Sequence, residues 1–590
     1  MRELLQSSHV VLVPLLTAIA IYYIYKGRKA STALWTALSL MVLLGVIPAE
    51  KAFAGFSSDA FITISLFMIF SAGLESSGVI NILLNRVLSR AKSESGGLAL
   101  FMALSASVSV FLNNTLVVVT FLRPLKAWAE RRGFAASHFL IPLSYSAIVG
   151  GLGSIIGTST NLTVVGAAKG IYPHYQMGFW DIGILGLPIT ILSIIYMVVF
   201  KNIILPKRTS GIEAITQTRE YSVEYTVQKG CDISGKSIEV SGLRNMSGLY
   251  LAEIFRAEQR IIGPSAQFII QEGDQLLFVG APESLAEIRS IRGLEASTKA
   301  KLADDLKSMS HFYEAVIAPQ SHLVDHSLKA IRFRENYGAV VLAILRNGKR
   351  VEGKLGTVKI EAGDVLLLES ERDLVSAWSK RRDFFFVSRV AHNDAPAYHN
   401  AGKTAAVGIL CLVLASTDVL PILEVALIGA LLMLFLKCVT FFDALRSMDK
   451  DTLLVVAASS GLGAAFQKSG IFQALVSEQT LSMFANPVVL LVLAFVLTSI
   501  ASEFMSNNAA GVLGIVGFLP LVQRLGLDPH PFVMAVMVGA STSYLTSYGY
   551  QTNLMVKGVG GYKESDFFRA GIGISFISLL VIVVWGMIIF

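Results

Sequence analysis

Long apolar runs alternate with short polar segments over most of this chain. These runs predict four membrane spans in each half, at residues 10–25, 30–48, 59–76 and 178–203, and at 403–418, 420–437, 452–467 and 565–590. Most are close to the roughly 20 residues that cross a bilayer as a helix. Two more segments, 137–167 and 531–556, are apolar but interrupted by polar residues, which predicts broken spans. The pattern is typical of a polytopic α-helical membrane protein.

Two further apolar segments fit neither one crossing nor two. The segment 97–130 carries Asn113-Asn114-Thr115 near its middle, and the segment 487–525 carries Ser506-Asn507-Asn508. Unpaired amides are costly in hydrocarbon, so a polar cluster inside a membrane segment indicates a function. We therefore expect two re-entrant hairpins, each of which enters the membrane, turns at its polar tip and leaves on the same side.

Motifs of the first half recur in the second half at a nearly constant spacing. Three pairs of blocks lie 392 or 393 residues apart: Ser77–Val79 with Ser469–Ile471, Ser109 with Ser502, and Gly157–Val164 with Gly549–Val556. Three matches at nearly one spacing indicate a duplicated membrane unit. Each unit has five crossings and one hairpin. Because five is odd, the second copy enters the bilayer from the opposite side, which predicts inverted repeats.

The basic residues indicate the orientation. They gather in the loops after the first and third spans and at the base of the first hairpin: Lys26, Arg28, Lys29, Arg86, Arg90, Lys92, Arg123, Lys126, Arg131 and Arg132. Cytoplasmic loops carry the excess of Lys and Arg in membrane proteins. Both termini are therefore predicted to lie outside, and the middle of the chain inside.

The middle of the chain has a different composition from the two ends. Charge rises there, and short β-branched runs alternate with Gly-Asp turns, which predicts small α+β modules. The region is itself duplicated at a spacing of 90 residues, with Gly273-Asp274 matching Gly363-Asp364. We divide the chain into an N-terminal transmembrane repeat (1–208), two inserted modules (209–297 and 298–392) and a C-terminal transmembrane repeat (393–590). The alternative is that the modules are folded spacers without a ligand.

Composition excludes several classes of protein. Of the 590 residues, 53% are hydrophobic and 15% charged, whereas a soluble protein carries charge on about a quarter of its residues. The net charge of +7 reflects cytoplasmic loops rather than a nucleic-acid surface. Cys231, Cys411 and Cys438 are too far apart to indicate a disulfide framework or a metal site. The chain has no P-loop and no G-x-S-x-G motif, so we do not expect an enzyme.

The paired motifs resemble those of the divalent anion/sodium symporter family, within the ion transporter superfamily. Asn113-Asn114-Thr115 and Ser506-Asn507-Asn508 are similar to its paired Ser-Asn-Thr signatures. Gly157–Asn161 and Gly549–Asn553 resemble the members associated with sulfate. The resemblance implies a homodimer in the inner (plasma) membrane that works by alternating access, with Na⁺ as the coupling ion and no organic cofactor.

The central modules resemble TrkA-C domains, also called RCK C-terminal domains, which are ligand-binding modules of potassium-channel regulators. That resemblance implies a cytoplasmic regulator of transport. A nucleotide second messenger such as cyclic di-AMP is the ligand it implies, and the sequence assigns no residues to that ligand.

The chain departs from the symporter motifs at a few positions. Asn113 stands where the family usually has Ser, and Asn508 where it usually has Thr. The prolines that dicarboxylate carriers show beside their unwound segments are replaced by Ser159-Thr160 and Gln551-Thr552. These differences favour a smaller anion than a C4-dicarboxylate, and sulfate is the one we expect.

The residue types in these motifs suit both a sodium ion and an anion. Sodium prefers hard oxygen donors, such as the carbonyls that a hairpin tip or a broken helix leaves free. Helix N-termini suit an anion, and Asn can serve either partner. The first predicted sodium site uses Ser109, Asn113, Asn114 and backbone near Gly157, and the second uses Ser502, Ser506, Asn507 and backbone near Gly549. The predicted anion site between them uses Asn114, Thr115, Thr158, Ser159, Asn507, Asn508 and Tyr550.

Other interpretations remain open at this stage. The main alternative is a proton-coupled or exchange carrier of a dicarboxylate or another oxyanion. A channel gated by TrkA-C domains is a further alternative, since Ser547–Gln551 resembles a potassium filter, but such a filter needs four copies around one axis. Glu503 is interpreted as an acceptor for backbone amides, with proton coupling as the alternative.

Overall fold

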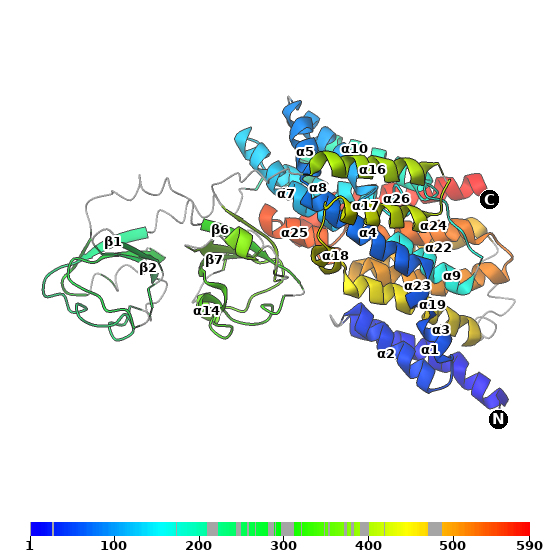
Figure 1. Cartoon of the computed structure of the whole chain (residues 1–590), viewed down its shortest axis with the longest axis horizontal. Coiled ribbons are helices and arrows are strands. Elements are labelled where there is room, and N and C mark those ends of the chain that lie inside the picture. The colour runs from blue at the N-terminus through cyan, green and yellow to red at the C-terminus, as the bar shows by residue number, and fades with distance from the viewer. Residues whose placement is uncertain are drawn as a thin grey trace.

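The structure, a computed structural model, consists of a helical body with two β-sheets beside it (Figure 1). It describes residues 2–590 except 26–28, 92, 173, 209–221, 244–248, 257–258, 263, 266, 281–287, 289–290, 297–311, 320, 347–348, 352–354, 371–373, 379–380, 382, 390–399, 418 and 470–485. The predicted domain boundaries near 209, 297 and 392 lie outside the described residues, as do Gly470 and Ile471 of one repeated block.

Most helices of the first half follow the predicted apolar runs. The helices are α1 (Arg2–Tyr25), α2 (Ala30–Leu43), α3 (Ala49–Phe53), η1 (Ala54–Ser57), α4 (Asp59–Ser76), α5 (Val79–Ser89), α6 (Glu94–Ser109), α7 (Asn114–Arg131), α8 (Ser137–Gly150), α9 (Ser159–Ile171) and α10 (Gly183–Ile204). Of these, α3, η1 and α5 lie outside the predicted runs. The second helix ends before its predicted limit because the chain turns at Gly45, whose φ of +73° favours glycine.

The helices of the second half repeat this order. They are α16 (Ala401–Ser416), α17 (Ile422–Phe435), α18 (Phe441–Ser447), α19 (Lys450–Ser469), α22 (Pro487–Phe504), α23 (Asn507–Arg524), α24 (Pro529–Ser541), α25 (Gln551–Gly560) and α26 (Glu564–Ile589). The sequence did not predict α5 and α18. The signal for α5 was its spacing, because Ile80, Leu84 and Leu88 recur every four residues and are buried.

Each predicted hairpin is a pair of helices joined by a short turn. The first is α6 and α7, and the second is α22 and α23. Each predicted broken span is also two helices, α8 with α9 and α24 with α25, separated by non-helical residues. Four helical stretches among the described residues are long and apolar enough to cross a membrane: Ala49–Ser76, Gly183–Ile204, Pro487–Phe504 and Glu564–Ile589.

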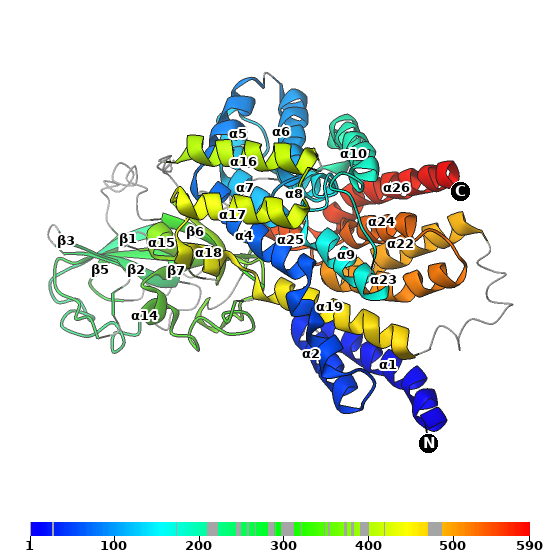
Figure 2. The same ribbon diagram turned by 45° about the vertical axis from the view of Figure 1, so that its right-hand side comes forward.

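The broken spans lie in the middle of the helical body (Figure 2). Every residue of α8 is buried, and so are nearly all residues of α9 and α25. The outer helices α10 and α26 instead expose large apolar side chains such as Ile191 and Phe576, which suit lipid. The polar residues of the broken spans are therefore held away from the lipid-facing surface.

The two sheets have five strands each and the same strand order. The first sheet module contains β1 (Ser222–Val227), β2 (Leu249–Arg256), β3 (Gln259–Ile262), β4 (Gln275–Gly280) and β5 (Leu294–Ala296), in the order β3-β2-β4-β1-β5. The second sheet module contains β6 (Phe312–Ile317), α14 (Phe333–Tyr337), β7 (Val340–Arg346), β8 (Lys349–Arg350), η5 (Leu355–Thr357), β9 (Val365–Glu369), α15 (Leu374–Trp378) and β10 (Phe384–Arg389), in the order β8-β7-β9-β6-β10. Each strand of the first sheet therefore has a counterpart at the same place in the second sheet. The strand β6 begins 90 residues after β1, which is the spacing of the duplication in the sequence.

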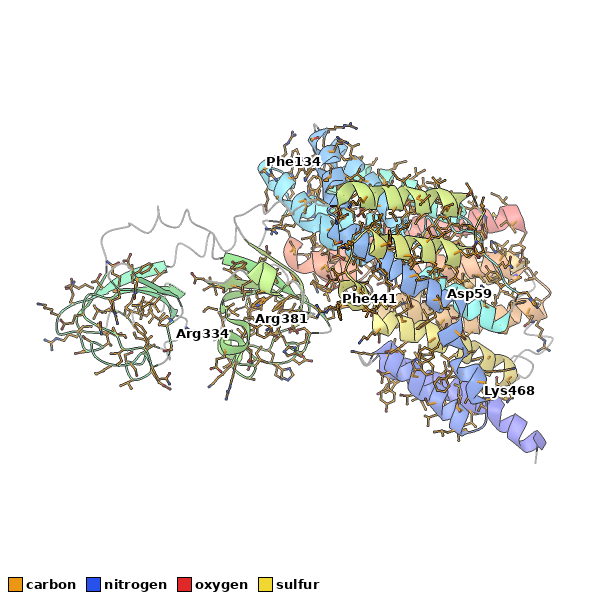
Figure 3. All side chains as sticks on the ribbon, viewed as in Figure 1. Asp59, Phe134, Arg334, Arg381, Phe441 and Lys468 are labelled. Atoms are coloured by element: carbon orange, nitrogen blue, oxygen red, sulfur yellow. The ribbon has the colours of Figure 1, made fainter. Side chains whose placement is uncertain are left out.

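One ion pair occurs at the same place in both sheet modules. Arg256 and Arg346 each donate two hydrogen bonds to a buried carboxylate, Asp274 and Asp364 respectively, at 2.7–2.9 Å. The Asp364 carboxylate raises the pKa of Arg346 above its usual value. The modules also touch each other, because Arg334 donates to the carbonyl of Pro264 at 3.0 Å, at the place marked in Figure 3.

Candidate functional site

The turn of the first hairpin is held by its polar residues. Asn113 is the N-cap of α7, and its side chain accepts from the amide of Thr115 at 2.9 Å. The hydroxyl of Ser109 donates to Oδ1 of Asn114 at 2.8 Å and lies 2.7 Å from the carbonyl of Ala147 on α8. Ser109 and Asn114 are both buried. The hairpin tip is thus fixed to the first half of a broken span.

The turn of the second hairpin repeats this arrangement. Ser506 is the N-cap of α23. The hydroxyl of Ser502 lies 3.0 Å from Oδ1 of Asn507 and 2.6 Å from the carbonyl of Ala540 on α24. Ser543 adds a further contact, because its hydroxyl donates to the same Asn507 oxygen at 2.9 Å. The predicted residues of each sodium site therefore come together in pairs, serine with asparagine.

An asparagine that the sequence analysis left out holds each broken span. Nδ2 of Asn161 donates to the carbonyls of Gly151 and Ser154 at 3.1 and 2.9 Å. Nδ2 of Asn553 donates to the carbonyls of Ser543 and Thr546 at 2.8 and 3.1 Å. The sequence did contain a signal for these two residues, because the repeated motifs Gly157–Asn161 and Gly549–Asn553 both end in asparagine.

Oxygen atoms gather around the glycines of the first broken span. A methyl group on Gly157 would lie 2.6 Å from the carbonyl oxygen of Gly151 and 2.9 Å from that of Ser109. A methyl group on Gly151 would lie 2.7 Å from Oδ1 of Asn114. Only glycine permits this approach, and the oxygens it brings together are the hard donors that a sodium ion prefers. The donor set here fits a sodium ion.

The second broken span has a carboxylate at the corresponding place. A methyl group on Gly549 would lie 2.8 Å from Oε2 of Glu503. Glu503 accepts from the amides of Leu545 and Thr546 at 2.8 and 3.0 Å, and from the Thr546 hydroxyl at 2.7 Å. It therefore accepts backbone amides, as the sequence analysis favoured. These amides belong to the broken span rather than to the hairpin that carries Glu503.

Other polar residues join the two halves of the chain. Nδ2 of Asn114 donates to the hydroxyl of Tyr550 at 3.2 Å. Oδ1 of Asn508 accepts from the hydroxyl of Thr160 at 3.0 Å and lies 3.5 Å from that of Ser159. Thr158 is the N-cap of α9 and Tyr550 the N-cap of α25. Four of the predicted anion residues thus form contacts across the interface between the halves: Asn114, Ser159, Asn508 and Tyr550.

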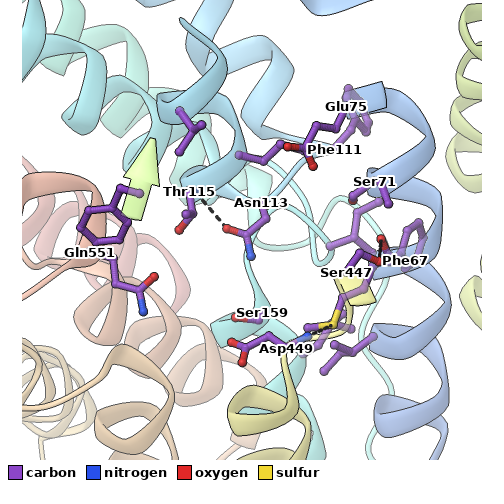
Figure 4. A pocket seen from close by; sticks show the side chains of 18 residues that line it. Phe67, Ser71, Glu75, Phe111, Asn113, Thr115, Ser159, Ser447, Asp449 and Gln551 are labelled. Carbon is purple, nitrogen blue, oxygen red and sulfur yellow. Dashed lines mark hydrogen bonds between the residues drawn. The ribbon is translucent and has the colours of Figure 1, made fainter. Parts of the chain in front are cut away.

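A cavity of about 370 Å³ opens beside the first hairpin (Figure 4). Of the predicted site residues, Asn113, Thr115 and Ser159 line it. The other predicted anion residues are outside the lining of this cavity: Asn114, Thr158, Asn507, Asn508 and Tyr550. Asn113, predicted as a sodium ligand, therefore lines the cavity, whereas Asn114 does not.

The sequence analysis missed most of the cavity wall. Figure 4 shows Gln551 beside Thr115, with Phe67 and Ser71 of α4 on the opposite side. The wall also includes Glu75, Asp449 and Phe385 of β10. No lysine or arginine is among its eighteen lining residues, all of them described. An anion in this cavity would meet polar uncharged groups and two carboxylates, so its charge needs a bound cation for balance.

Comparison with known proteins points to membrane transporters. A model of the family described as citrate transporters matches residues 21–518. The chain is 35% identical over 575 residues to a Chlamydomonas reinhardtii protein named for regulation of the sulfur deprivation response, covering 94% of this chain and 97% of that protein. It is 27% identical over 348 residues to sodium/sulfate cotransporter 2 of the same organism, covering 55% of this chain and 39% of that protein.

Among solved structures, the chain is similar to the YdaH transporter of Alcanivorax borkumensis. The TM-score is 0.44 at 12% sequence identity, covering 99% of this chain and 98% of that one.

Proposed function

This chain belongs to the citrate transporter family, and from that premise we propose that it is a sodium-coupled symporter of a small divalent anion, with sulfate as the substrate. Membership makes it a multi-pass membrane transporter rather than an enzyme. The resemblance to sodium/sulfate symporters in the sequence motifs agrees with the sodium/sulfate cotransporters among its relatives.

One observation carries the proposal of sodium coupling. Each hairpin tip brings a buried serine and asparagine against a carbonyl of a broken span, Ser109 with Asn114 and Ser502 with Asn507. Such oxygen clusters suit a hard cation. Since the cavity wall has no basic side chain, a bound cation and the helix N-termini supply the positive potential that an anion requires.

The test is uptake of radioactive sulfate into liposomes that contain the purified protein. We expect an inward sodium gradient to drive uptake and its replacement by choline to abolish it. Tenfold excess thiosulfate, citrate and succinate, added separately, would show which anion competes. Uptake that persists without sodium would overturn the proposal of sodium coupling.

A second candidate is a proton-coupled or exchange carrier of a dicarboxylate or of another oxyanion. The family description names citrate, and Glu75 and Asp449 place two carboxylates in the cavity wall. Carboxylates inside membrane segments often belong to proton relays. This candidate predicts uptake driven by a pH gradient or by counter-substrate in sodium-free liposomes. The transporter family itself gives no support to a channel.

We also propose how the chain is arranged in the membrane. The two halves are inverted repeats with both termini outside, and the sheet modules are cytoplasmic TrkA-C domains that bind a regulatory ligand such as a nucleotide second messenger. Support comes from the matched contacts at the two hairpins and the matched strand orders of the two modules. The protein is proposed to act as a homodimer in the plasma membrane.

A further inference from the structure

The two sheet modules are alike in fold but differ in how they meet the membrane helices. Three apolar residues of the second module, Val316, Leu345 and Val365, belong to the same buried core as the helical body. The buried apolar residues of the first module, among those the structure describes, form a core of their own. Only the second module is therefore docked on the helices through buried apolar side chains in the described part of the chain.

A glycine turn of the second module packs directly on α25. A methyl group on Gly558 would lie 2.4 Å from the carbonyl oxygen of Gly363, and one on Gly363 would lie 3.0 Å from Leu554. The equivalent turn of the first module is at Gly273, where an added methyl group would have nothing within 4 Å. The same turn is thus an interface in one module and open in the other.

A buried ion pair fastens the second module to the first hairpin. Nζ of Lys126 on α7 lies 3.3 Å from Oε2 of Glu314 on β6, and both side chains are 8% exposed. Replacing one partner would leave the other as an uncompensated buried charge while the module is docked, so docking depends on both residues of the pair. The equivalent residue of the first module is Glu224 on β1, which is only half-buried.

The second module also forms part of the cavity wall. Phe385 of β10 lines the cavity together with Asn113 at the start of the first hairpin tip and Gln551 at the start of α25. The module contacts two helices, α7 and α25. Each of these helices begins at or next to one of these cavity residues. One domain therefore contacts a hairpin of the first half, a broken span of the second half and the cavity that they enclose.

We infer that the second sheet module is an autoinhibitory lock on transport. Docked as it is here, it holds α7 and α25 together and closes one side of the cavity with Phe385. The two helices can move relative to each other only after the module has undocked from them. A regulator that binds the undocked module better than the docked one would then raise the transport rate. The inference rests on the proposed transport function.

The first test breaks the ion pair at one end, so that a charge is left unpaired only while the module is docked. We expect the single variant Lys126→Met, which leaves the Glu314 carboxylate without its partner in the docked interface, to raise the maximal uptake rate at least about fivefold, the lower end of typical coupling between sites. The charge-reversed pair Lys126→Glu with Glu314→Lys should return the rate toward that of the unmodified protein. The matched control is Glu224→Leu in the first module, which should leave the rate unchanged. An unchanged or lower rate in Lys126→Met would overturn the lock.

A second measurement does not depend on the substrate. Phe385→Cys is introduced into protein whose Cys231, Cys411 and Cys438 are replaced by alanine, and its labelling rate by a maleimide is followed in detergent. We expect slow labelling with the ion pair present and labelling at least about fivefold faster in Lys126→Met. Equal labelling rates would refute the lock. Faster labelling together with no uptake of any tested anion would refute the proposed substrate class and leave the lock supported.

Discussion

The two hairpins share their serine–asparagine contacts but differ in the residues that support them. In both, a serine near the end of the first helix meets an asparagine at the start of the second and a carbonyl of a broken span. The residue after that serine is Val110 in the first hairpin and Glu503 in the second. The N-cap of the second half of the broken span is Thr158 in one and Tyr550 in the other.

These differences show how each broken span is held. In the first half, the hydroxyl of Ser154 donates to the backbone carbonyl of Val110, so a side chain of the broken span is held by a backbone group of the hairpin. In the second half, the carboxylate of Glu503 receives the backbone amides of Leu545 and Thr546 instead. The shared contacts form the oxygen clusters, and the differing ones decide how rigidly each cluster is supported.

The largest effect should follow from removal of the shared asparagine oxygens. Asn114→Ala and Asn507→Ala should each lower sodium-driven sulfate uptake roughly 100-fold, equivalent to about 2.7 kcal/mol of activation free energy. Each change removes an oxygen donor from the proposed sodium site and one of the hydrogen bonds of a buried serine hydroxyl. The measurement is initial uptake rate at equal amounts of monodisperse protein. Asn486→Ala, which alters an exposed helix cap on α22, is the control, and near-normal uptake by both site variants would contradict the shared role.

The next effect concerns Glu503 and distinguishes support from proton transfer. Glu503→Ala removes the acceptor of three hydrogen bonds and should lower uptake about 30-fold, or roughly 2 kcal/mol. Glu503→Gln keeps an oxygen acceptor and should lower it only about threefold. Initial rates from pH 6 to 8 complete the test. If Glu503→Gln is as inactive as Glu503→Ala and loses its pH dependence, the residue carries protons and the support role is wrong. Val110→Ala serves as the matched change in the first hairpin.

Much of the helical layout could be predicted from the sequence because apolar length and polar interruptions are local properties. The hairpins and broken spans were predicted in this way, and the polar tips at Asn114 and Asn507 followed from the repeated motifs. Such patterns did not predict α5 and α18, which are short and carry polar residues. The duplication also contained Asn161 and Asn553, although the analysis gave them no role.

The cavity wall could not be predicted because it is formed by tertiary contacts. Glu75 and Asp449 come from outside the repeated motifs, and Phe385 comes from a sheet that looked like a separate domain. A single sequence gives no sign that β10 reaches the first hairpin. The same limit applies to Lys126, which the sequence analysis counted among the basic residues near the first hairpin, because its buried contact with Glu314 is a tertiary one.

A smaller effect should follow from loss of the Tyr550 hydroxyl. Tyr550→Phe removes the group that accepts from Nδ2 of Asn114, and it keeps the ring that fills the space between the halves. We expect the apparent KM for sodium or sulfate to rise about fivefold, equivalent to roughly 1 kcal/mol, with little change in maximal rate. Tyr548→Phe is the control, because Tyr548 is 71% exposed. An unchanged KM for both ions would show that this link between the halves has no part in binding.

The smallest expected effect is a difference in stability between the two asparagines that hold the broken spans. Asn161 and Asn553 each donate to two carbonyls, but Oδ1 of Asn553 also accepts from the hydroxyl of Ser144 at 2.6 Å, whereas Oδ1 of Asn161 is buried with no partner among the described residues. Asn553→Ala should therefore destabilise the protein by about 1 kcal/mol more than Asn161→Ala, the usual worth of one hydrogen bond. Thermal unfolding of both variants in detergent, followed by tryptophan fluorescence, measures the difference. Ser144→Ala should abolish most of it, and if the two asparagine variants unfold at the same temperature, the extra contact adds nothing to the second broken span.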